Sequence, residues 1–317
     1  MYMKIPEALK KLLEKQQYKF IGENSAVKVC TWAKKSLRDE DFCYKQKFYG
    51  IKSHLCCQMS TTVEICPNRC IFCWREVGYT VANDMKKSEN PEKLFENAIK
   101  AQKKLLSGFG GNIKINRQKV KEALEPMHFA ISLTGEPTAD KNLQKFVDYL
   151  HKKGKTTFVV SNGMFPDRLK KIKPTQLYLS VDAPNEKLFK KICNPQFKDS
   201  WKRFLKSLKV MKTKNMETRT ALRLTLIKDL NMTDLKGYSK IIKIANPMFV
   251  EAKSYMFVGS SMQRLTIKNM PRHEEIRDFT EKLAKLIDYR IADEKKESRV
   301  VLLVRKDVKD SEIKIKL

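Results

Sequence analysis

The sequence predicts an α/β fold built on a parallel barrel. β-strand patterns recur roughly every twenty to forty residues, and helical patterns fill most of the intervals between them. This alternation is typical of βα units, which pair their strands in parallel. The 317 residues suffice for one large domain, and 42% of them are hydrophobic. No apolar run is long enough to cross a membrane and no signal peptide is apparent, so we expect a cytoplasmic protein.

The first part of the chain begins with an amphipathic pattern and then becomes irregular. Residues 4–20 carry apolar side chains at helical spacing, which predicts a helix, whereas residues 21–55 are basic and show no clear period. Residues 58–65 are rich in β-branched side chains and predict the first barrel strand. We therefore divide the chain into an N-terminal extension, residues 1–57, and a barrel with a C-terminal extension, residues 58–317.

The remaining elements alternate along the chain. A helix is predicted over 91–106, because Pro91 suits a first helical turn. A glycine-rich and then basic stretch, residues 107–123, follows and leads into a helix. Further strands are predicted at 128–134, 156–161, 176–181, 220–227, 248–256 and 299–304. Further helices are predicted at 140–152, 185–192, 199–213, 233–244 and 273–288.

Three cysteines follow the first predicted strand with the spacing C-x3-C-x2-C: Cys66, Cys70 and Cys73. Pro67 and Asn68 turn the chain, so the thiols lie on a loop at the carboxyl end of a strand, where barrels of this class carry their chemistry. Three thiolates can hold three irons of a [4Fe–4S] cube and leave the fourth iron open to a substrate. Zinc sites usually add a second cysteine pair or histidines, and an odd trio cannot pair internally as disulfides.

A second group of cysteines precedes this loop. Cys30, Cys43 and Cys56 are each thirteen residues apart. Two equal gaps leading into a cluster motif indicate a second iron–sulfur site, with chance spacing as the alternative. We interpret Cys57 and Cys193 as small buried hydrophobic residues.

The composition is strongly basic: 65 Lys and Arg against 36 Asp and Glu give a net charge of +29. Such an excess attracts polyanions, and nucleic acid is the leading candidate partner, with a lysine-rich proteome as the alternative explanation. We expect one basic stretch to touch RNA phosphates at the rim of the barrel mouth, although a solvated loop would look similar. Its residues are Lys103, Lys104, Lys114, Arg117, Lys119 and Lys121.

The C-x3-C-x2-C spacing, with Phe72 just before the last thiol, resembles the radical S-adenosylmethionine (SAM) superfamily. The resemblance implies a partial TIM barrel, (βα)6, with a [4Fe–4S] cluster and SAM at its mouth. Gly135 and Glu136 follow the second barrel strand and look like the element that receives the SAM amino group, with Thr134 replacing its first glycine. An acidic residue at a helix start is the alternative for Glu136.

Three further residues stand where the superfamily binds SAM. Asn162, after the third barrel strand, is expected near the SAM ribose, although an ordinary turn explains it equally. Asp182, after the fourth strand, and Arg223, inside the fifth, are expected contacts of the SAM ribose or carboxylate. A structural ion pair is the alternative for each.

A closer resemblance is to the TYW1 family, the 4-demethylwyosine synthases of archaea and eukaryotes. It covers nearly the whole chain and depends on the thirteen-residue cysteine spacing together with four short motifs. These are Cys43-Tyr44-Lys45, Trp74-Arg75, Thr134-Gly135-Glu136-Pro137 and Gly259-Ser260-Ser261.

This resemblance implies a tRNA-dependent carbon–carbon lyase of wybutosine biosynthesis. The family condenses N1-methylguanosine-37 of tRNA-Phe with pyruvate to form 4-demethylwyosine. The first cluster, on Cys66, Cys70 and Cys73, would cleave SAM to a radical that takes a hydrogen from the N-methyl group. A second [4Fe–4S] cluster and Lys45, as a Schiff base, would hold pyruvate. No flavodoxin-like module is apparent, so we expect a separate electron donor of the flavodoxin or ferredoxin type.

Two other classes of protein share some of these features. A two-cluster radical SAM activase acting on a protein would not need so basic a surface. A non-enzymatic protein that binds RNA and holds a metal cluster would explain the charge and the thiols, but not the open position of a three-thiol site.

Overall fold

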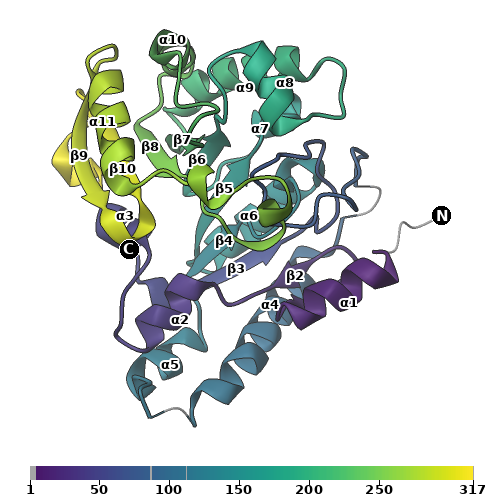
Figure 1. Ribbon diagram of the computed structural model, residues 1–317. Coiled ribbons are helices and arrows are strands. Elements are labelled where there is room, and N and C mark those ends of the chain that lie inside the picture. The colour runs from purple at the N-terminus through teal and green to yellow at the C-terminus, as the bar shows by residue number, and fades with distance from the viewer. Residues whose placement is uncertain (1–4, 86–87, 112, 317) are drawn as a thin grey trace.

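A computed structural model describes residues 5–85, 88–111 and 113–316, which form a ten-stranded sheet ordered β1-β2-β3-β4-β5-β6-β7-β8-β10-β9 (Figure 1). The central strands β3 to β8 pair in parallel, each with the next along the chain. They are β3 (Cys56–Ser60), β4 (His128–Ile131), β5 (Thr156–Ser161), β6 (Gln176–Ser180), β7 (Arg219–Leu226) and β8 (Phe249–Ser254). Because antiparallel strands flank both sides, the parallel sheet does not close on itself. The predicted α/β class and partial six-stranded barrel are confirmed.

Helices connect the parallel strands. Buried residues of the sheet, such as Phe129 and Leu222, share one core with helical residues such as Phe146 and Leu208. The helices are α4 (Pro91–Leu106), α5 (Arg117–Ala123), α6 (Leu143–Lys152), α7 (Pro166–Leu169), α8 (Glu186–Cys193), α9 (Ser200–Lys214), α10 (Leu235–Ala245) and α11 (His273–Ala284). Helix α4 begins at the predicted proline, where the Asn90 side chain accepts the Lys93 N–H group at 3.1 Å.

Antiparallel strands extend the sheet on both sides. Strands β1 (Lys19–Phe20) and β2 (Ala26–Val27) join β3, and β10 (Val300–Arg305) joins β8 with β9 (Tyr289–Lys295) outside it. Strand β9 was not predicted, because its sequence, YRIADEK, is mostly charged and only half-buried. An edge strand needs no hydrophobic alternation on its open side.

The N-terminal segment contains helices α1 (Glu7–Lys15), α2 (Thr31–Leu37) and α3 (Tyr44–Tyr49) and the 3-10 turn η1 (Ser53–Leu55). Helices α2 and α3 have at most seven residues, too few to show a helical period in the sequence. Helix α1 ends before the predicted boundary at residue 20, and Gln17 beyond it has φ +65°.

Helix α3 packs against aromatic side chains of the barrel. Tyr44, Phe48 and Tyr49 form one buried cluster with Phe158 of β5 and Tyr178 of β6. The ring centres of Tyr49 and Phe249 on β8 lie 5.3 Å apart. The N-terminal segment therefore supplies part of the barrel interior.

The first barrel strand begins and ends earlier than predicted, covering Cys56–Ser60 instead of 58–65. The chain turns there because the Ser60 hydroxyl donates to the Thr134 carbonyl and accepts the Thr62 N–H group. Cys56 thus opens a barrel strand, although the predicted division places it in the N-terminal extension. That division at residue 57 stays a prediction.

None of the described helices is long and apolar enough to span a membrane.

Candidate active site

The loop that carries Cys66, Cys70 and Cys73 follows β3 and is held by the end of α8. The Ile71 N–H group donates to the Ile192 carbonyl at 2.9 Å, and the Arg69 N–H group donates to the Asn194 carbonyl at 3.1 Å. Asn194 takes a left-handed conformation with φ 41°, which ends α8 and frees this edge for pairing. The loop is therefore fixed by backbone pairing on one side.

The segment after β8 holds the other side of the loop. The Arg264 guanidinium donates to the Ile71 carbonyl at 3.1 Å and to the Cys73 carbonyl at 2.6 Å. Gly259 has φ +60°, and a Cβ there would lie 2.4 Å from the Trp74 carbonyl oxygen, so this approach needs glycine. Sequence reasoning missed Arg264, whose partners are backbone carbonyls almost 200 residues away.

The three thiols of this loop stand close enough to influence one another. Burial, then Cys70, raises the pKa of Cys66, and burial, then Cys70, raises that of Cys73 to about 12. For Cys70 the largest cause of its raised pKa is a contact with the Cys193 thiol. Cys193 is buried as expected, but it lies beside the loop and not only in the core. Cys57 is fully buried in the core.

Gly135 and Glu136 lie behind the same loop. Gly135 has φ +73°, and a Cβ there would come within 1.6 Å of the Thr62 carbonyl oxygen. The Glu136 carboxylate is 1% exposed and accepts hydrogen bonds from Thr138, from the Ser161 hydroxyl at 2.7 Å and from the Asn162 N–H group at 2.6 Å. This carboxylate is thus occupied in joining the ends of β4 and β5.

Asn162 and Asp182 face the thiols from neighbouring strand ends. The Asn162 amide donates to the Cys66 sulfur at 3.5 Å. Asp182 is buried, and burial raises the pKa of its carboxyl group to about 6. Its Oδ1 atom has no hydrogen-bond partner among the described residues. A buried acceptor left open beside three thiols fits a site that a polar ligand completes.

The second group of cysteines converges as well. Cys30 precedes α2, where its sulfur accepts the Ala33 N–H group at 3.3 Å, Cys43 precedes α3, and Cys56 opens β3. Burial raises the pKa of all three thiols, that of Cys43 to about 11. The positive charge of Lys45 partly opposes this rise at each thiol. The thirteen-residue spacing thus brings three separate elements to one place.

Lys45 points from α3 into the barrel interior. The residue is 9% exposed, and its ammonium group lies 4.8 Å from the ring centre of Phe158 and 4.6 Å from that of Tyr178. In the described part of the chain it makes neither a hydrogen bond nor an ion pair. Burial lowers the pKa of this amine, although Glu251 partly opposes that effect.

Arg223 and Lys253 bring two further cations close to Lys45, and Glu251 is a carboxylate beside them. Arg223 on β7 is the register partner of Glu251 on β8, whose carboxylate accepts the hydroxyl groups of Tyr44 and Tyr49 at 2.8 Å each. Burial and then Arg223 lower the pKa of Lys253 to about 8. Arg223 also influences Asp182 and Lys45, so it stands between the two groups of cysteines.

The donors in both groups fit iron–sulfur clusters. Each group offers three partly buried thiols that come together from loops and element ends, as cluster ligands do. Among the described residues, no three His, Cys, Asp or Glu side chains are arranged to hold a single metal ion. A cube of four irons is wider than one ion, so its ligands lie further apart than those of zinc.

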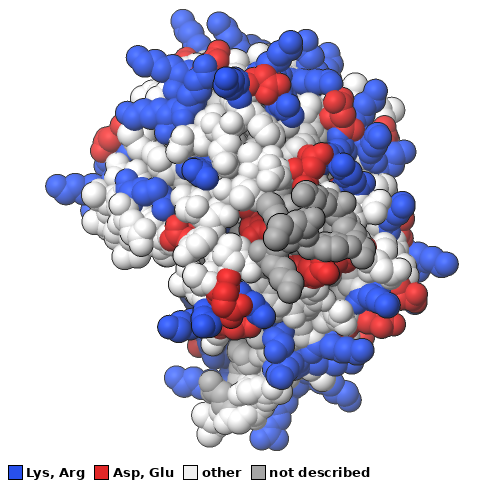
Figure 2. Space-filling model, turned by 90° about the vertical axis from the view of Figure 1, so that its right-hand side faces the viewer, with Lys and Arg blue, Asp and Glu red and all other residues white. Residues whose placement is uncertain are grey.

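The predicted RNA-binding stretch lies elsewhere. Helix α5 contacts η1 and α2, and η1 leads directly into the amino end of β3. Lys119 pairs with Asp39, and Lys103 pairs with Glu125 at 2.7 Å. The prediction that this stretch lines the rim around the cysteine loop is therefore wrong, because α4 carries the chain back to the amino ends of the strands. Figure 2 shows Lys and Arg spread around the margin of one face.

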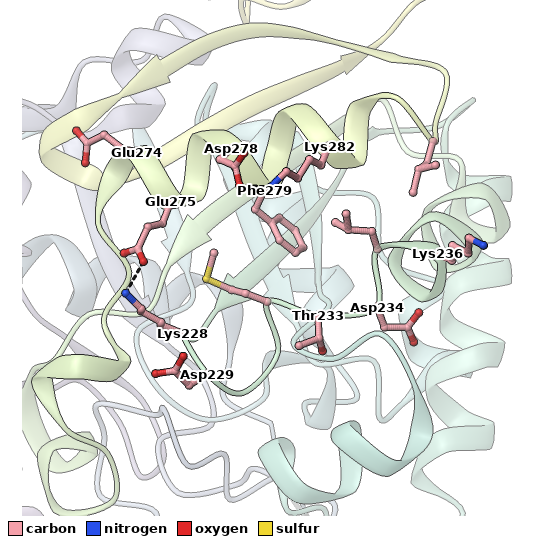
Figure 3. Close-up of a pocket in the computed structure, with 13 residues that line it drawn as sticks. Lys228, Asp229, Thr233, Asp234, Lys236, Glu274, Glu275, Asp278, Phe279 and Lys282 are labelled. Atoms are coloured by element: carbon pink, nitrogen blue, oxygen red, sulfur yellow. Dashed lines mark hydrogen bonds and ion pairs between the residues drawn. The ribbon is translucent and has the colours of Figure 1, made fainter.

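A groove of about 1020 Å³ lies between the segment after β7 and helix α11 (Figure 3). None of the predicted site residues lines it. Two pairs of its charged side chains form ion pairs, Lys228 with Glu275 at 2.5 Å and Lys282 with Asp278 at 2.7 Å. The groove is thus separate from the chemistry described above.

Comparison with known proteins identifies close relatives. The family model of the radical SAM superfamily matches residues 60–240, and that of wyosine base formation matches residues 244–305. The SAM-dependent tRNA 4-demethylwyosine synthase of Pyrococcus abyssi is 47% identical over 96% of this chain and 90% of its own length. That of Methanocaldococcus jannaschii is 41% identical over 94% and 96%, respectively.

Two solved structures are similar over almost the whole chain. A structure of TYW1 with a lysine–pyruvate adduct bound has a TM-score of 0.87 and 38% identity, covering 98% of both chains. A crystal structure of archaeal TYW1 has a TM-score of 0.80 and 35% identity, covering 98% of this chain and 100% of the other.

Proposed function

The chain belongs to the family of SAM-dependent tRNA 4-demethylwyosine synthases and is a radical SAM enzyme, and on this premise we propose how its residues serve the reaction. The proposed substrates are N1-methylguanosine-37 of tRNA-Phe and pyruvate, and the product is 4-demethylwyosine. The observation that carries the proposal is Lys45, an amine without a polar partner in the described chain, buried in the barrel beside three thiols.

In this proposal Cys66, Cys70 and Cys73 would hold the first [4Fe–4S] cluster, and SAM would bind beside it. When bound, these two groups supply the carbon radical that removes a hydrogen atom from the N-methyl group. Asn162 orients the Cys66 side of the site through its 3.5 Å contact with the thiol. Asp182 offers its open oxygen to a SAM hydroxyl or amino group.

In this proposal Gly135 and Glu136 contact SAM mainly through their backbone atoms. Since the Glu136 carboxylate already accepts donors from Thr138, Ser161 and Asn162, we assign the SAM amino group to carbonyl oxygens of the Thr134–Glu136 turn. Glu136 then positions this turn against β5.

In this proposal Cys30, Cys43 and Cys56 would hold the second cluster, and pyruvate would bind beside Lys45. The amine attacks the ketone carbon and water leaves, which gives a Schiff base within the barrel. The aromatic faces of Phe158 and Tyr178 keep water from the imine. The lysine–pyruvate adduct in the structure of the related TYW1 supports this assignment.

Arg223 stands between the two sites and is proposed to hold a carboxylate there. A charge of +29 suits an RNA substrate, and Lys103, Lys104, Lys114, Arg117, Lys119 and Lys121 are proposed to contact tRNA phosphates away from the modified base. The proposal places the enzyme in the cytoplasm and requires a separate reductant of the flavodoxin or ferredoxin type.

Trapping the imine tests this function. Anaerobically reconstituted enzyme is incubated with labelled pyruvate and borohydride, and the modified peptide is identified by mass spectrometry. We expect the label on Lys45 and its loss in Lys45→Arg. Lys47→Arg is the matched control, because Lys47 lies on the same helix but is exposed and paired with Asp293 at 2.9 Å. Full 4-demethylwyosine formation by Lys45→Arg would exclude the Schiff base.

A further inference from the structure

Arg75, two residues after the last cysteine of the cluster loop, is buried and has no polar partner among the residues that the structure describes. It is 6% exposed, and none of its three guanidinium nitrogens forms a hydrogen bond within the described chain. The guanidinium lies over the indole of Trp74 and 5.0 Å from the ring centre of Tyr18. Arginine has five N–H donors, and a buried cation that leaves all of them unused is costly unless something else completes the site.

Lys28 brings a second cation to the same rings. Its ammonium group lies 4.8 Å from the ring centre of Tyr18 and 5.6 Å from that of Trp74. Neither Lys28 nor Arg75 forms an ion pair with a described carboxylate. Two cations thus share one aromatic pair with no counter-charge from the described part of the chain, an arrangement that an anion completes.

Trp74, whose ring covers the Arg75 guanidinium, lies at the protein surface. Trp74 is 39% exposed, whereas Tyr18 is 3% exposed. The Trp74 carbonyl accepts the Ser260 N–H group at 3.1 Å, so the segment after β8 lies against it. That segment exposes two more apolar side chains, Val258 at 45% and Met262 at 52%. Exposed apolar side chains gathered beside an active site mark a binding surface.

The position relates this site to both groups of cysteines. Arg75 follows Cys73 by two residues, and Lys28 precedes Cys30 by two residues. Any RNA that delivers a base to the space between the two groups must bring its backbone near this edge of the barrel.

We propose that Trp74, Arg75 and Lys28 form the binding site for a nucleotide of the RNA substrate's anticodon loop. The Trp74 indole leaves the guanidinium and stacks on an unpaired base, and Arg75 and Lys28 then bind the phosphodiester next to that base. Trp74 is the ring that moves, because Tyr18 is enclosed. This assignment rests on the proposed function, since it takes tRNA as the substrate.

The features of this site favour RNA as its ligand over a small carboxylate. Single-stranded RNA is bound by an aromatic ring that stacks on a base together with cations that hold its backbone. The site offers both, and its aromatic side is open to solvent. SAM and pyruvate offer a carboxylate but would leave the exposed Trp74 face unused.

The test measures binding of a fluorescein-labelled anticodon stem-loop carrying N1-methylguanosine to the reconstituted enzyme over a range of salt concentrations. In Lys28→Gln and in Arg75→Gln we expect the slope of log K against log salt to become shallower by about 0.7 for each cation removed. Lys171→Gln, an exposed lysine near the amino end of β6, removes the same charge and should leave the slope unchanged. Because Arg75 is buried, its replacement can affect folding as well as RNA binding. Lys28→Gln therefore gives a second measurement of the salt slope that does not depend on how the Arg75 variant folds.

Trp74 provides a separate readout. Trp74→Leu should weaken binding by about 5- to 150-fold without changing the salt slope, and Trp74→Phe should restore most of the affinity. Unchanged slopes in both cation variants would overturn the proposal, as would a loss of SAM or pyruvate binding with RNA binding intact. Borohydride trapping of pyruvate on Lys45 in the same preparations shows whether the proposed function itself holds.

Discussion

Gly135 illustrates how closely single residues are constrained around the candidate site. A Cβ at this position would overlap the Thr62 carbonyl oxygen at 1.6 Å, and the backbone has φ +73°. We expect Gly135→Ala to lower the free energy of unfolding by about 2–4 kcal/mol, from the clash and the left-handed conformation together. Urea unfolding measures this effect. Gly154→Ala is the control: Gly154 has φ +70° with nothing within 4 Å of the added Cβ, so only about 1–2 kcal/mol should be lost.

His128, at the amino end of β4, predicts a pH dependence of stability. Its ring contacts the Thr156 hydroxyl at 2.7 Å and accepts the Lys52 N–H group at 3.2 Å. Burial, and then His54, lowers its pKa from 6.5 to about 4. The unfolded chain therefore binds the proton first, and the stability contribution is complete above pH 6.5 and lost as the pH falls toward 4.

The size of this effect is roughly 3 kcal/mol between pH 6.5 and 4, from the difference between the two pKa values. Unfolding free energies of His128→Gln should show a correspondingly flatter profile in this range. His151→Gln, at an exposed position, should keep most of the slope. An unchanged profile in His128→Gln would show that other groups dominate acid sensitivity.

Among the elements, the cluster loop depends on contacts that come from far along the chain. Arg264 ties its end to the segment after β8 through two carbonyls. In Arg264→Ala we expect amide hydrogen exchange of residues 69–74 to speed up by about tenfold or more, since two charge-assisted hydrogen bonds are lost. Lys268→Ala, an exposed lysine four residues on, should leave the exchange unchanged. Equal exchange in both variants would mean that Arg264 does not help to hold the loop.

The elements also show what sequence can predict. The six parallel strands and the long helices have strong periodic patterns, and apart from the first barrel strand the structure has them close to the predicted ranges. Helices α2 and α3 and strand β9 were missed, because short helices and charged edge strands carry little pattern. Resemblance to known motifs identified residues that the fold brings close together, such as Cys30 and Lys45. It could not reveal Arg264 or the Cys193 contact, which depend on tertiary pairing alone.

At the scale of the whole molecule, the two cysteine groups stand at opposite ends of one short strand. Cys56 opens β3 and Cys66 follows its end, and a strand of five residues is roughly 17 Å long. Arg223 lies between the groups. Its charge partly opposes the rise that burial causes in the pKa of Asp182 beside one group, and it adds to the fall that burial causes in the pKa of Lys45 beside the other. In the proposed reaction the methylated base lies in the space between them, with the first cluster on one side and pyruvate on the other.

The basic surface predicts strongly salt-dependent tRNA binding. Removing Lys114, Arg117 and Lys119 together should make the salt slope shallower by about 2 to 3, if α5 touches the double-stranded part of the tRNA. Filter binding across salt concentrations measures it. The same triple variant should bind the isolated anticodon stem-loop normally, because α5 lies at the amino ends of the strands. No change with full tRNA would remove α5 from the RNA footprint.

Conversion of the methylated base tests the proposed reaction itself. Reconstituted enzyme is supplied with SAM, pyruvate, a chemical reductant and tRNA-Phe bearing N1-methylguanosine-37, and the nucleosides are analysed by mass spectrometry. We expect conversion to 4-demethylwyosine by the unaltered enzyme, and loss of this conversion in Cys66→Ala and in Lys45→Arg. SAM cleavage that leaves N1-methylguanosine unchanged, with both clusters present, would contradict it.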